Sequence, residues 1–176
     1  RRQFLLKLEQ FAAERDGRPG YFIDIELNRF KQLNEAMGFK TGDKLIHDCV
    51  ERIKSLLPPD TLIGRLGACE FGIAIPDECA EPTLEIQLDQ LVAEVCKPYL
   101  IDERRVVVTV SAGAVEFGTT HMEQVDMLKR ANLALHRSRS MGRKQWAMFE
   151  PELGRVADHR RWIEAEMQVA IDRQDF

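Results

Sequence analysis

Carboxylates stand at two places in the sequence where they could bind a divalent cation. Asp24 and Glu26 lie near the end of the apolar run 21–27, and Glu70 follows a tight turn at 67–69. Residues two apart on a strand share one face, so Asp24 and Glu26 should point the same way. If the turn comes close to that strand end, Glu70 could converge on Glu26 to hold a metal ion. On spacing alone, the plainer interpretation is that these are solvated turn acids, because exposed carboxylates are the common case.

These carboxylates would be positioned by a chain that alternates helices and strands. Apolar residues at helical spacing predict helices over 2–15, over 29–37, from Thr41 to the Pro58-Pro59 pair, from Pro82 toward Pro98, and over 122–140. Runs rich in β-branched and aromatic residues predict strands over 21–27, 61–66, 70–75, 99–101, 106–115 and 145–149. The strands on either side of Gly67-Ala68 have the spacing of a hairpin. Interleaved elements of this kind predict an α/β or α+β fold, with a central sheet flanked by helices.

Composition is that of an ordinary globular domain, and it excludes two classes of function. Of 176 residues, 44% are apolar and 31% charged, enough for one domain with a hydrophobic core. The net charge of −4, with both signs interleaved, argues against a general nucleic-acid binder. No apolar run reaches the roughly 18–20 residues that span a bilayer, so we expect no membrane contact by this segment.

The four cysteines are spaced too widely for a CxxC metal knuckle, and we interpret most of them as small hydrophobic residues. A reduced, cytoplasmic location is the simpler expectation for such a chain. The parent protein could still be anchored to a membrane by a segment upstream of this one.

Several motifs, in order along the chain, resemble the GGDEF family of diguanylate cyclases. Residues 24–43 (DIELNRFKQLNEAMGFKTGD) are similar to the family's D-x-D-x-F-K-x-x-N-D and G-H-x-x-G-D motifs. Residues 65–71 (RLGACEF) are similar to R-x-G-G-D-E-F, 110–113 to its S-x-G strand, and 129–143 to its R-A-D-x-A-L-Y-x-A-K-x-x-G-R helix. The match covers roughly residues 1–150, and together the motifs are highly specific. The resemblance implies a central sheet like the palm of nucleotidyl cyclases and polymerases.

The resemblance also implies a metal site with an altered ligand. Cyclases of the family condense two GTP molecules into cyclic di-GMP, one GTP held by each half of a homodimer, with divalent ions bound by carboxylates. Glu26 and the main-chain carbonyl of Leu27 match the family's metal-binding pair, which implies Mg²⁺ as the cofactor. The extra methylene of Glu26 moves its carboxylate by about 1 Å, and Mg²⁺ demands near-ideal octahedral geometry. We therefore expect Mg²⁺ binding to be weakened.

The signature turn departs further from the family pattern. Cys69 stands where the family has a second metal-binding carboxylate, and a thiol is a poor ligand for Mg²⁺. Gly67 and Ala68 would lie against the nucleotide, and the methyl group of Ala68 should restrict a turn in which the family has glycine. Glu70 is retained as the catalytic remnant of the signature. Loss of a metal ligand should cost orders of magnitude in rate, so we expect impaired or absent cyclase activity.

The nucleotide pocket is better preserved. Asn34 and Asp43 match the family's guanine-reading pair, because a carboxylate can accept from the ring N–H and the exocyclic amine of guanine together. An alternative interpretation is that Asp43 caps a helix that begins there. Lys31, Arg139 and Arg143 match or replace basic residues expected near the triphosphate.

The C-terminal segment predicts a domain boundary and a partner. We expect residues 1–150 to form the GGDEF-like domain, and 151–176 to form a linker helix toward a following EAL-like phosphodiesterase domain, because 149–171 is similar to the link in GGDEF–EAL tandem proteins. Our leading hypothesis is a degenerate domain that binds GTP and regulates the attached phosphodiesterase rather than synthesising cyclic di-GMP. Two alternatives stay open: a weakly active diguanylate cyclase, motivated by Glu26 and Glu70, and a nucleotide-free interaction or dimerisation module, motivated by Ala68 and the charged exit helix.

Overall fold

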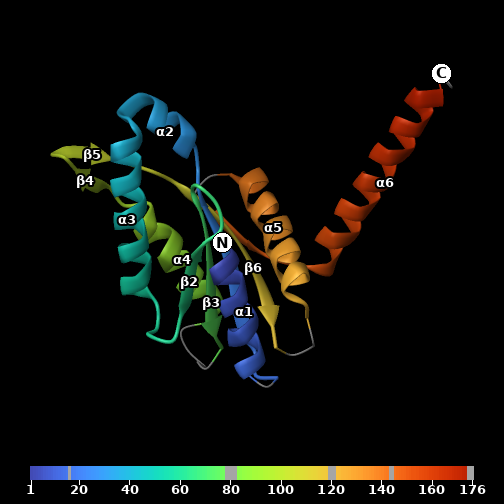
Figure 1. Ribbon diagram of the computed structural model, residues 1–176, viewed down its shortest axis with the longest axis horizontal. Coiled ribbons are helices and arrows are strands. Elements are labelled where there is room, and N and C mark those ends of the chain that lie inside the picture. Colours follow the sequence, from blue (N-terminus) through green and yellow to red (C-terminus); the bar gives the residue numbers. More distant parts are fainter. Residues whose placement is uncertain (16, 78–82, 119–121, 143–144, 174–176) are drawn as a thin grey trace.

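The computed structural model describes residues 1–15, 17–77, 83–118, 122–142 and 145–173, which form a central five-stranded sheet (Figure 1). Its strands, in the order β2-β3-β1-β6-β7, are β2 (Leu62–Arg65), β3 (Glu70–Pro76), β1 (Gly20–Leu27), β6 (Val110–Phe117) and β7 (Gln145–Met148). The central strand β1 is antiparallel to both β3 and β6, whereas β7 runs parallel to β6. The sheet flanked by helices agrees with the fold class predicted from the sequence.

Helices cover both faces of this sheet (Figure 1). The elements are α1 (Arg2–Glu14) and α5 (Gln124–Met141) on one face, and α3 (Phe39–Leu56) and α4 (Leu84–Val95) on the other. A short helix, α2 (Phe30–Met37), joins the end of β1 to α3. The fold is therefore a three-layer arrangement with the sheet in the middle.

The alternation of side chains along β1 divides the interior into two cores. Ile23, Ile25 and Leu27 belong to the core under α3 and α4, whereas Phe22 belongs to the core under α1 and α5. The free thiol of Cys49 is fully buried in the first of these cores, which agrees with its interpretation as a small hydrophobic residue.

Most predicted boundaries differ from the structure by a few residues, and two of the differences have a clear structural origin. The helix predicted from Thr41 begins at Phe39, because Gly38 takes a positive φ of 86° and completes the turn from α2 in a single residue. The strand predicted over 106–115 is two strands. Its first residue belongs to a separate hairpin, β4 (Tyr99–Ile101) with β5 (Arg104–Val106), and β6 begins only at Val110.

The last helix, α6 (Pro151–Arg173), leads away from the sheet and its covering helices (Figure 1). Val156, Trp162 and Met167 are exposed on it, each with close to 60% of its surface accessible. Within the described ranges, none of the helices has the length and apolar character needed to cross a membrane.

Candidate functional site

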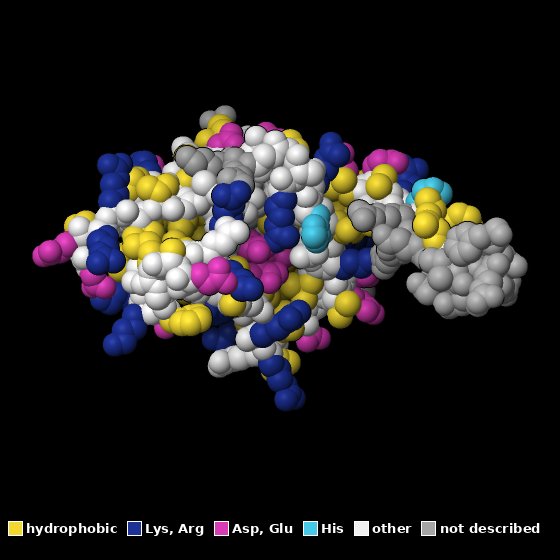
Figure 2. Space-filling view, turned by 90° about the horizontal axis from the view of Figure 1, so that it is seen from above, with side chains coloured by type: hydrophobic (Ala, Val, Ile, Leu, Met, Phe, Trp, Pro, Cys, Tyr) yellow, Lys and Arg dark blue, Asp and Glu magenta, His cyan; other side chains and the backbone are white. Residues whose placement is uncertain are grey.

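The ends of β1 and β3 bring three carboxylates onto one face of the sheet. Glu26 is directly opposite Glu70 across the two antiparallel strands, and Asp24 is opposite Gly72. Asp24, Glu26 and Glu70 alternate with core residues that pack under α3 and α4, so they share the face that α5 covers. α2, which follows the end of β1, lies at the upper side of the molecule in Figure 1, and Figure 2 views that side. Acidic side chains gather near its middle, with Lys and Arg side chains around them (Figure 2).

Asp24 is the buried member of this carboxylate cluster, with only 2% of its surface exposed. Its Oδ1 atom has no hydrogen-bond partner within the described part of the chain. Its carboxyl group interacts with Glu70 and accepts a hydrogen bond from Asn132 of α5. Burial, and then the neighbouring Glu70 charge, raises the pKa of Asp24 to about 7, although Asn132 and Arg139 act in the opposite direction. Asp24 therefore retains a proton at pH values where an exposed aspartate is ionised.

Arg139 supplies the positive charge of the cluster. It lies in the last turn of α5 and forms an ion pair with Glu26. Their side chains are 35% and 27% exposed, so the pair is partly shielded from solvent. α5 can lie this close to the sheet because Gly113, the partner of Asp24 on β6, has no side chain. A Cβ atom there would overlap the backbone of Leu135 in α5.

Cys69 holds the signature turn against the end of β1 through its backbone. Its carbonyl oxygen accepts a hydrogen bond of 2.9 Å from the N–H of Leu27. The thiol is half-buried, and burial followed by the nearby Glu70 charge raises its pKa, while Arg65 acts in the opposite direction. The thiol packs against the core under α3 and α4.

Gly67 and Ala68 form the tip of the turn. The guanidinium of Arg65 donates hydrogen bonds to both carbonyl oxygens, at 2.9 Å to Gly67 and 2.6 Å to Ala68. The N–H of Gly67 donates to the carbonyl of Glu70 at 3.2 Å. Ala68 is exposed, and its φ is not in the left-handed region. The methyl group of Ala68 therefore introduces no backbone strain in this conformation.

The predicted base-reading residues lie where α2 meets α3. Asn34 lies on α2, and its Oδ1 atom is buried with no hydrogen-bond partner in the described ranges. Gly42 of α3 lies against this amide so closely that a Cβ atom would overlap Oδ1. Asp43, the next residue, is exposed. Because α3 begins at Phe39 with Gly38 at its N-cap, the alternative interpretation of Asp43 as a helix cap is wrong.

The predicted phosphate-binding cations are not equivalent. Lys31 is exposed on α2 and pairs with Glu35 at 3.9 Å. Arg143 lies outside the described residues. Arg139 forms an ion pair with Glu26 of the carboxylate cluster.

Asn132 contacts the carboxylate cluster but was not predicted from the sequence as a site residue. It lies seven residues before Arg139 on α5, which is two helical turns, so both side chains point to the same face. Asn132 hydrogen-bonds Asp24 while Arg139 pairs with Glu26. This seven-residue spacing of two polar residues on a helix, together with a glycine in the facing strand, is the signal that could have revealed the contact.

Each carboxyl group of the cluster interacts with another group of the protein, although Oδ1 of Asp24 has no hydrogen-bond partner among the described residues. Glu26 is paired with Arg139, and Asp24 interacts with Glu70 and Asn132. Across the described ranges, no three His, Cys, Asp or Glu side chains are placed together to hold a metal ion.

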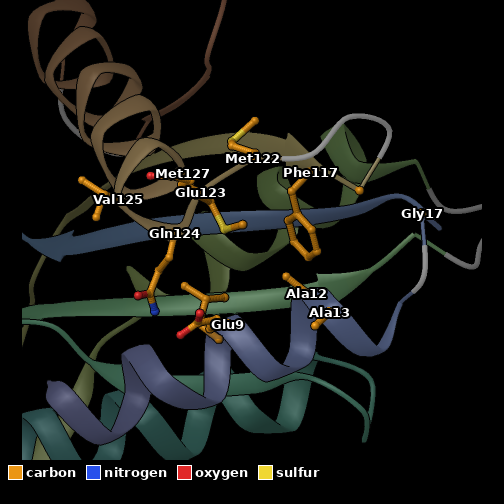
Figure 3. A pocket seen from close by; sticks show the side chains of 12 residues that line it. Glu9, Ala12, Ala13, Gly17, Phe117, Met122, Glu123, Gln124, Val125 and Met127 are labelled. Carbon is orange, nitrogen blue, oxygen red and sulfur yellow. The ribbon is translucent and has the colours of Figure 1, made fainter.

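A cavity of about 710 Å³ lies elsewhere, between α1, the end of β6 and the start of α5 (Figure 3). Its lining is mainly apolar, including Ala12, Phe117 and Met127, with Glu9 and Glu123 beside them. It shares no lining residue with the carboxylate cluster, so it is a separate feature of the molecule.

Comparison with known proteins identifies the family. The family model described as diguanylate cyclase, GGDEF domain, matches residues 1–145. The cyclic di-GMP phosphodiesterase NbdA of Pseudomonas aeruginosa is 29% identical over 168 residues, which cover 96% of this chain and 21% of NbdA. The bifunctional diguanylate cyclase/cyclic di-GMP phosphodiesterase MucR of the same species is 27% identical over 173 residues, covering 97% of this chain and 25% of MucR. The chain thus spans a fifth to a quarter of the length of these relatives.

Solved structures show the same fold. The GGDEF domain of TpbB (YfiN) from Pseudomonas aeruginosa matches with a TM-score of 0.80 at 21% identity, covering 90% of this chain and 94% of that one. The GGDEF domain of DgcB from Caulobacter crescentus, solved in complex with c-di-GMP, matches with a TM-score of 0.75 at 25% identity, covering 85% and 88%. GGDEF domains generally use Mg²⁺. With a family match over most of its length and this fold, the chain belongs to the GGDEF family of diguanylate cyclase domains.

Proposed function

We propose that this domain binds GTP and regulates an attached phosphodiesterase domain, with little or no synthesis of cyclic di-GMP. The observation that carries the proposal is the buried Oδ1 atom of Asn34, which has no partner in the described chain and lies beside Gly42 and the exposed Asp43. An unsatisfied buried acceptor costs about 1–3 kcal/mol, so a ligand that brings a donor is favoured there.

Guanine carries the hydrogen-bond donors that would pair with the acceptors of Asn34 and Asp43. Its ring N–H and exocyclic amine are two donors on one edge, and the Asp43 carboxylate and Asn34 amide oxygen are acceptors. Adenine presents a ring acceptor in place of the ring N–H, so it would leave one acceptor unpaired. A site built to accept hydrogen bonds discriminates strongly against a ligand without the donors.

Two features support impaired catalysis. Cys69 offers a neutral thiol where the family signature has a carboxylate, and a thiol is a poor ligand for hard cations. Glu26, the other expected metal ligand, is paired with Arg139. Because metal-assisted phosphoryl transfer depends on both ligands, the remaining Glu70 is insufficient for an efficient cyclase.

The regulatory part of the proposal comes from the relatives and from α6. NbdA and MucR are phosphodiesterases by name, and this chain matches only part of each. α6 leads away from the domain and exposes Trp162 and Met167, so it could transmit a change to a following domain. GTP can bias that neighbour only by its difference in affinity for two arrangements, about 1–3 kcal/mol in typical allosteric systems. Homodimerisation, which condensation of two GTP molecules requires, is not needed for this role.

The decisive experiment measures cyclic di-GMP hydrolysis by the longer protein with and without GTP, in the wild type and in Asp43→Ala. We expect GTP to change the hydrolysis rate of the wild type only, without being consumed. An identical rate in all four conditions would remove the regulatory proposal. Titration calorimetry with GTP and ATP, in EDTA and in Mg²⁺, separates the alternatives: an interaction module binds neither nucleotide, and a weak cyclase forms cyclic di-GMP in Mg²⁺.

A further inference from the structure

We infer that Arg139 is the resident cation of the carboxylate cluster, and that its guanidinium, bound to Glu26, keeps divalent metal ions out of this site. The inference concerns the same site as the proposed function but does not depend on nucleotide binding. It assigns to Arg139 a role in cation specificity, in addition to the phosphate contact predicted from the sequence.

The carboxylate cluster needs a positive charge nearby. Glu26 and Glu70 are directly opposite each other on neighbouring strands, a placement in which like charges destabilise a sheet. Asp24 adds a third carboxyl group that is nearly excluded from solvent. The cluster is therefore stabilised by a cation, which can be a metal ion or a basic side chain.

The protein already supplies this cation as the side chain of Arg139. Arg139 is fixed by α5, whose close approach to β6 depends on Gly113. Its ion pair with Glu26 is only about one-third exposed. A guanidinium offers several N–H donors in a planar fork that suits a carboxylate. Because Arg139 belongs to the same chain, its pairing with Glu26 is intramolecular, and a dissolved metal ion must compete with it.

A metal ion would gain too little binding free energy at this site to displace Arg139. Mg²⁺ and Mn²⁺ prefer oxygen ligands, and Mg²⁺ dehydrates reluctantly and requires nearly octahedral geometry. The neighbouring Cys69 offers no oxygen ligand, and its half-buried thiol packs against the core under α3 and α4. A metal ion would have to separate Glu26 from Arg139 and leave the guanidinium without its partner.

The test uses Mn²⁺ alone, without nucleotide, and follows the loss of the free Mn²⁺ signal by electron paramagnetic resonance. We expect the wild type to bind Mn²⁺ weakly or not measurably, and Arg139→Met to bind at least about tenfold more tightly because Glu26 is released. Arg139→Lys should stay close to the wild type because it keeps the charge. Arg137→Met is the matched control, since Arg137 is exposed on the same helix and should leave binding unchanged.

A second substitution shows where the gained ion binds. Adding Glu26→Gln to Arg139→Met should remove the gained affinity, whereas a gain that persists in the double variant places the ion elsewhere and overturns the inference. Equal Mn²⁺ affinity in the wild type and Arg139→Met, whether strong, weak or undetectable, also overturns it. Circular dichroism checks the folding of each variant, and Arg139→Gln replaces Arg139→Met if the methionine variant does not fold.

Discussion

Glu26 and Glu70 are Cα partners at the end of the β1–β3 ladder, so two carboxylates face each other on the same side of the sheet. The chain separates these partners by 44 positions, and the antiparallel pairing of β1 with β3 brings them together. Arg139 from α5 pairs with one of the two, and Asp24 interacts with the other. The carboxylates of this cluster thus interact with other groups of the protein itself.

The first prediction concerns cyclase activity. The purified protein should form little or no cyclic di-GMP from GTP and Mg²⁺, because Cys69 replaces a metal-binding carboxylate. Ala68→Gly combined with Cys69→Asp should raise product formation, measured by chromatography of the nucleotides. The same double substitution in a Glu70→Gln background should remain inactive. Product formation by the wild type at the rate of an intact GGDEF enzyme would contradict this prediction.

Asp43→Ala should weaken GTP binding by about 1.5–3 kcal/mol, the usual range for a hydrogen bond to a charged group. Titration calorimetry measures the change. Glu51→Ala is the control, because Glu51 is exposed on the same helix, two turns further along. Unchanged GTP affinity in Asp43→Ala, or ATP binding as tight as GTP binding, would show that the base is not recognised here.

Gly42→Ala should disturb the base pocket without touching any charged group. The new Cβ atom would overlap Oδ1 of Asn34, so the amide must leave its place on α2. We expect GTP affinity to fall by about tenfold, equivalent to the roughly 1.4 kcal/mol of one hydrogen bond. Thermal unfolding monitors whether the helices remain packed. If GTP affinity is unchanged while the fold is intact, Asn34 does not contact the nucleotide.

The pH dependence of stability should reveal Asp24. Its folded-state pKa of about 7 lies above the value near 3.9 of an unfolded chain, so the folded state binds the proton more tightly. The resulting stabilisation is fully present below about pH 4 and is lost as the pH rises through 7. Asp24→Asn removes this dependence and should be more stable than the wild type at pH 8, by on the order of 2 kcal/mol.

Denaturant unfolding at pH 4, 6 and 8 measures this effect. Asp60→Asn, at an exposed loop position, is the control and should follow the wild type at every pH. Parallel pH profiles for the wild type and Asp24→Asn would show that Asp24 is ionised in the folded state throughout this range.

The sequence by itself determined the order of elements, the fold class and the family. Each of these rests on local information. The 3.6-residue and two-residue periods mark which side of a helix or strand faces the core, and the motifs 24–43 and 65–71 are contiguous. The β2–β3 hairpin was also predictable, because a tight turn at Gly67-Ala68 implies antiparallel pairing of the strands that flank it. The pairing of β3 with β1, which places Glu70 opposite Glu26, joins strands that are not consecutive in the chain.

Only the tertiary structure decided which charges neutralise one another. Glu26 and Arg139 are 113 positions apart, and their meeting depends on how closely α5 packs on β6 over Gly113. The burial of Asp24 depends on the same contact, because Asn132 and Arg139 reach it from α5. Periodicity reports which face of an element is apolar, but the distance between two packed elements follows from the side chains at their contact. The pairing of these charged groups therefore depends on how α5 packs on β6, and this packing cannot be predicted from any single segment of the sequence.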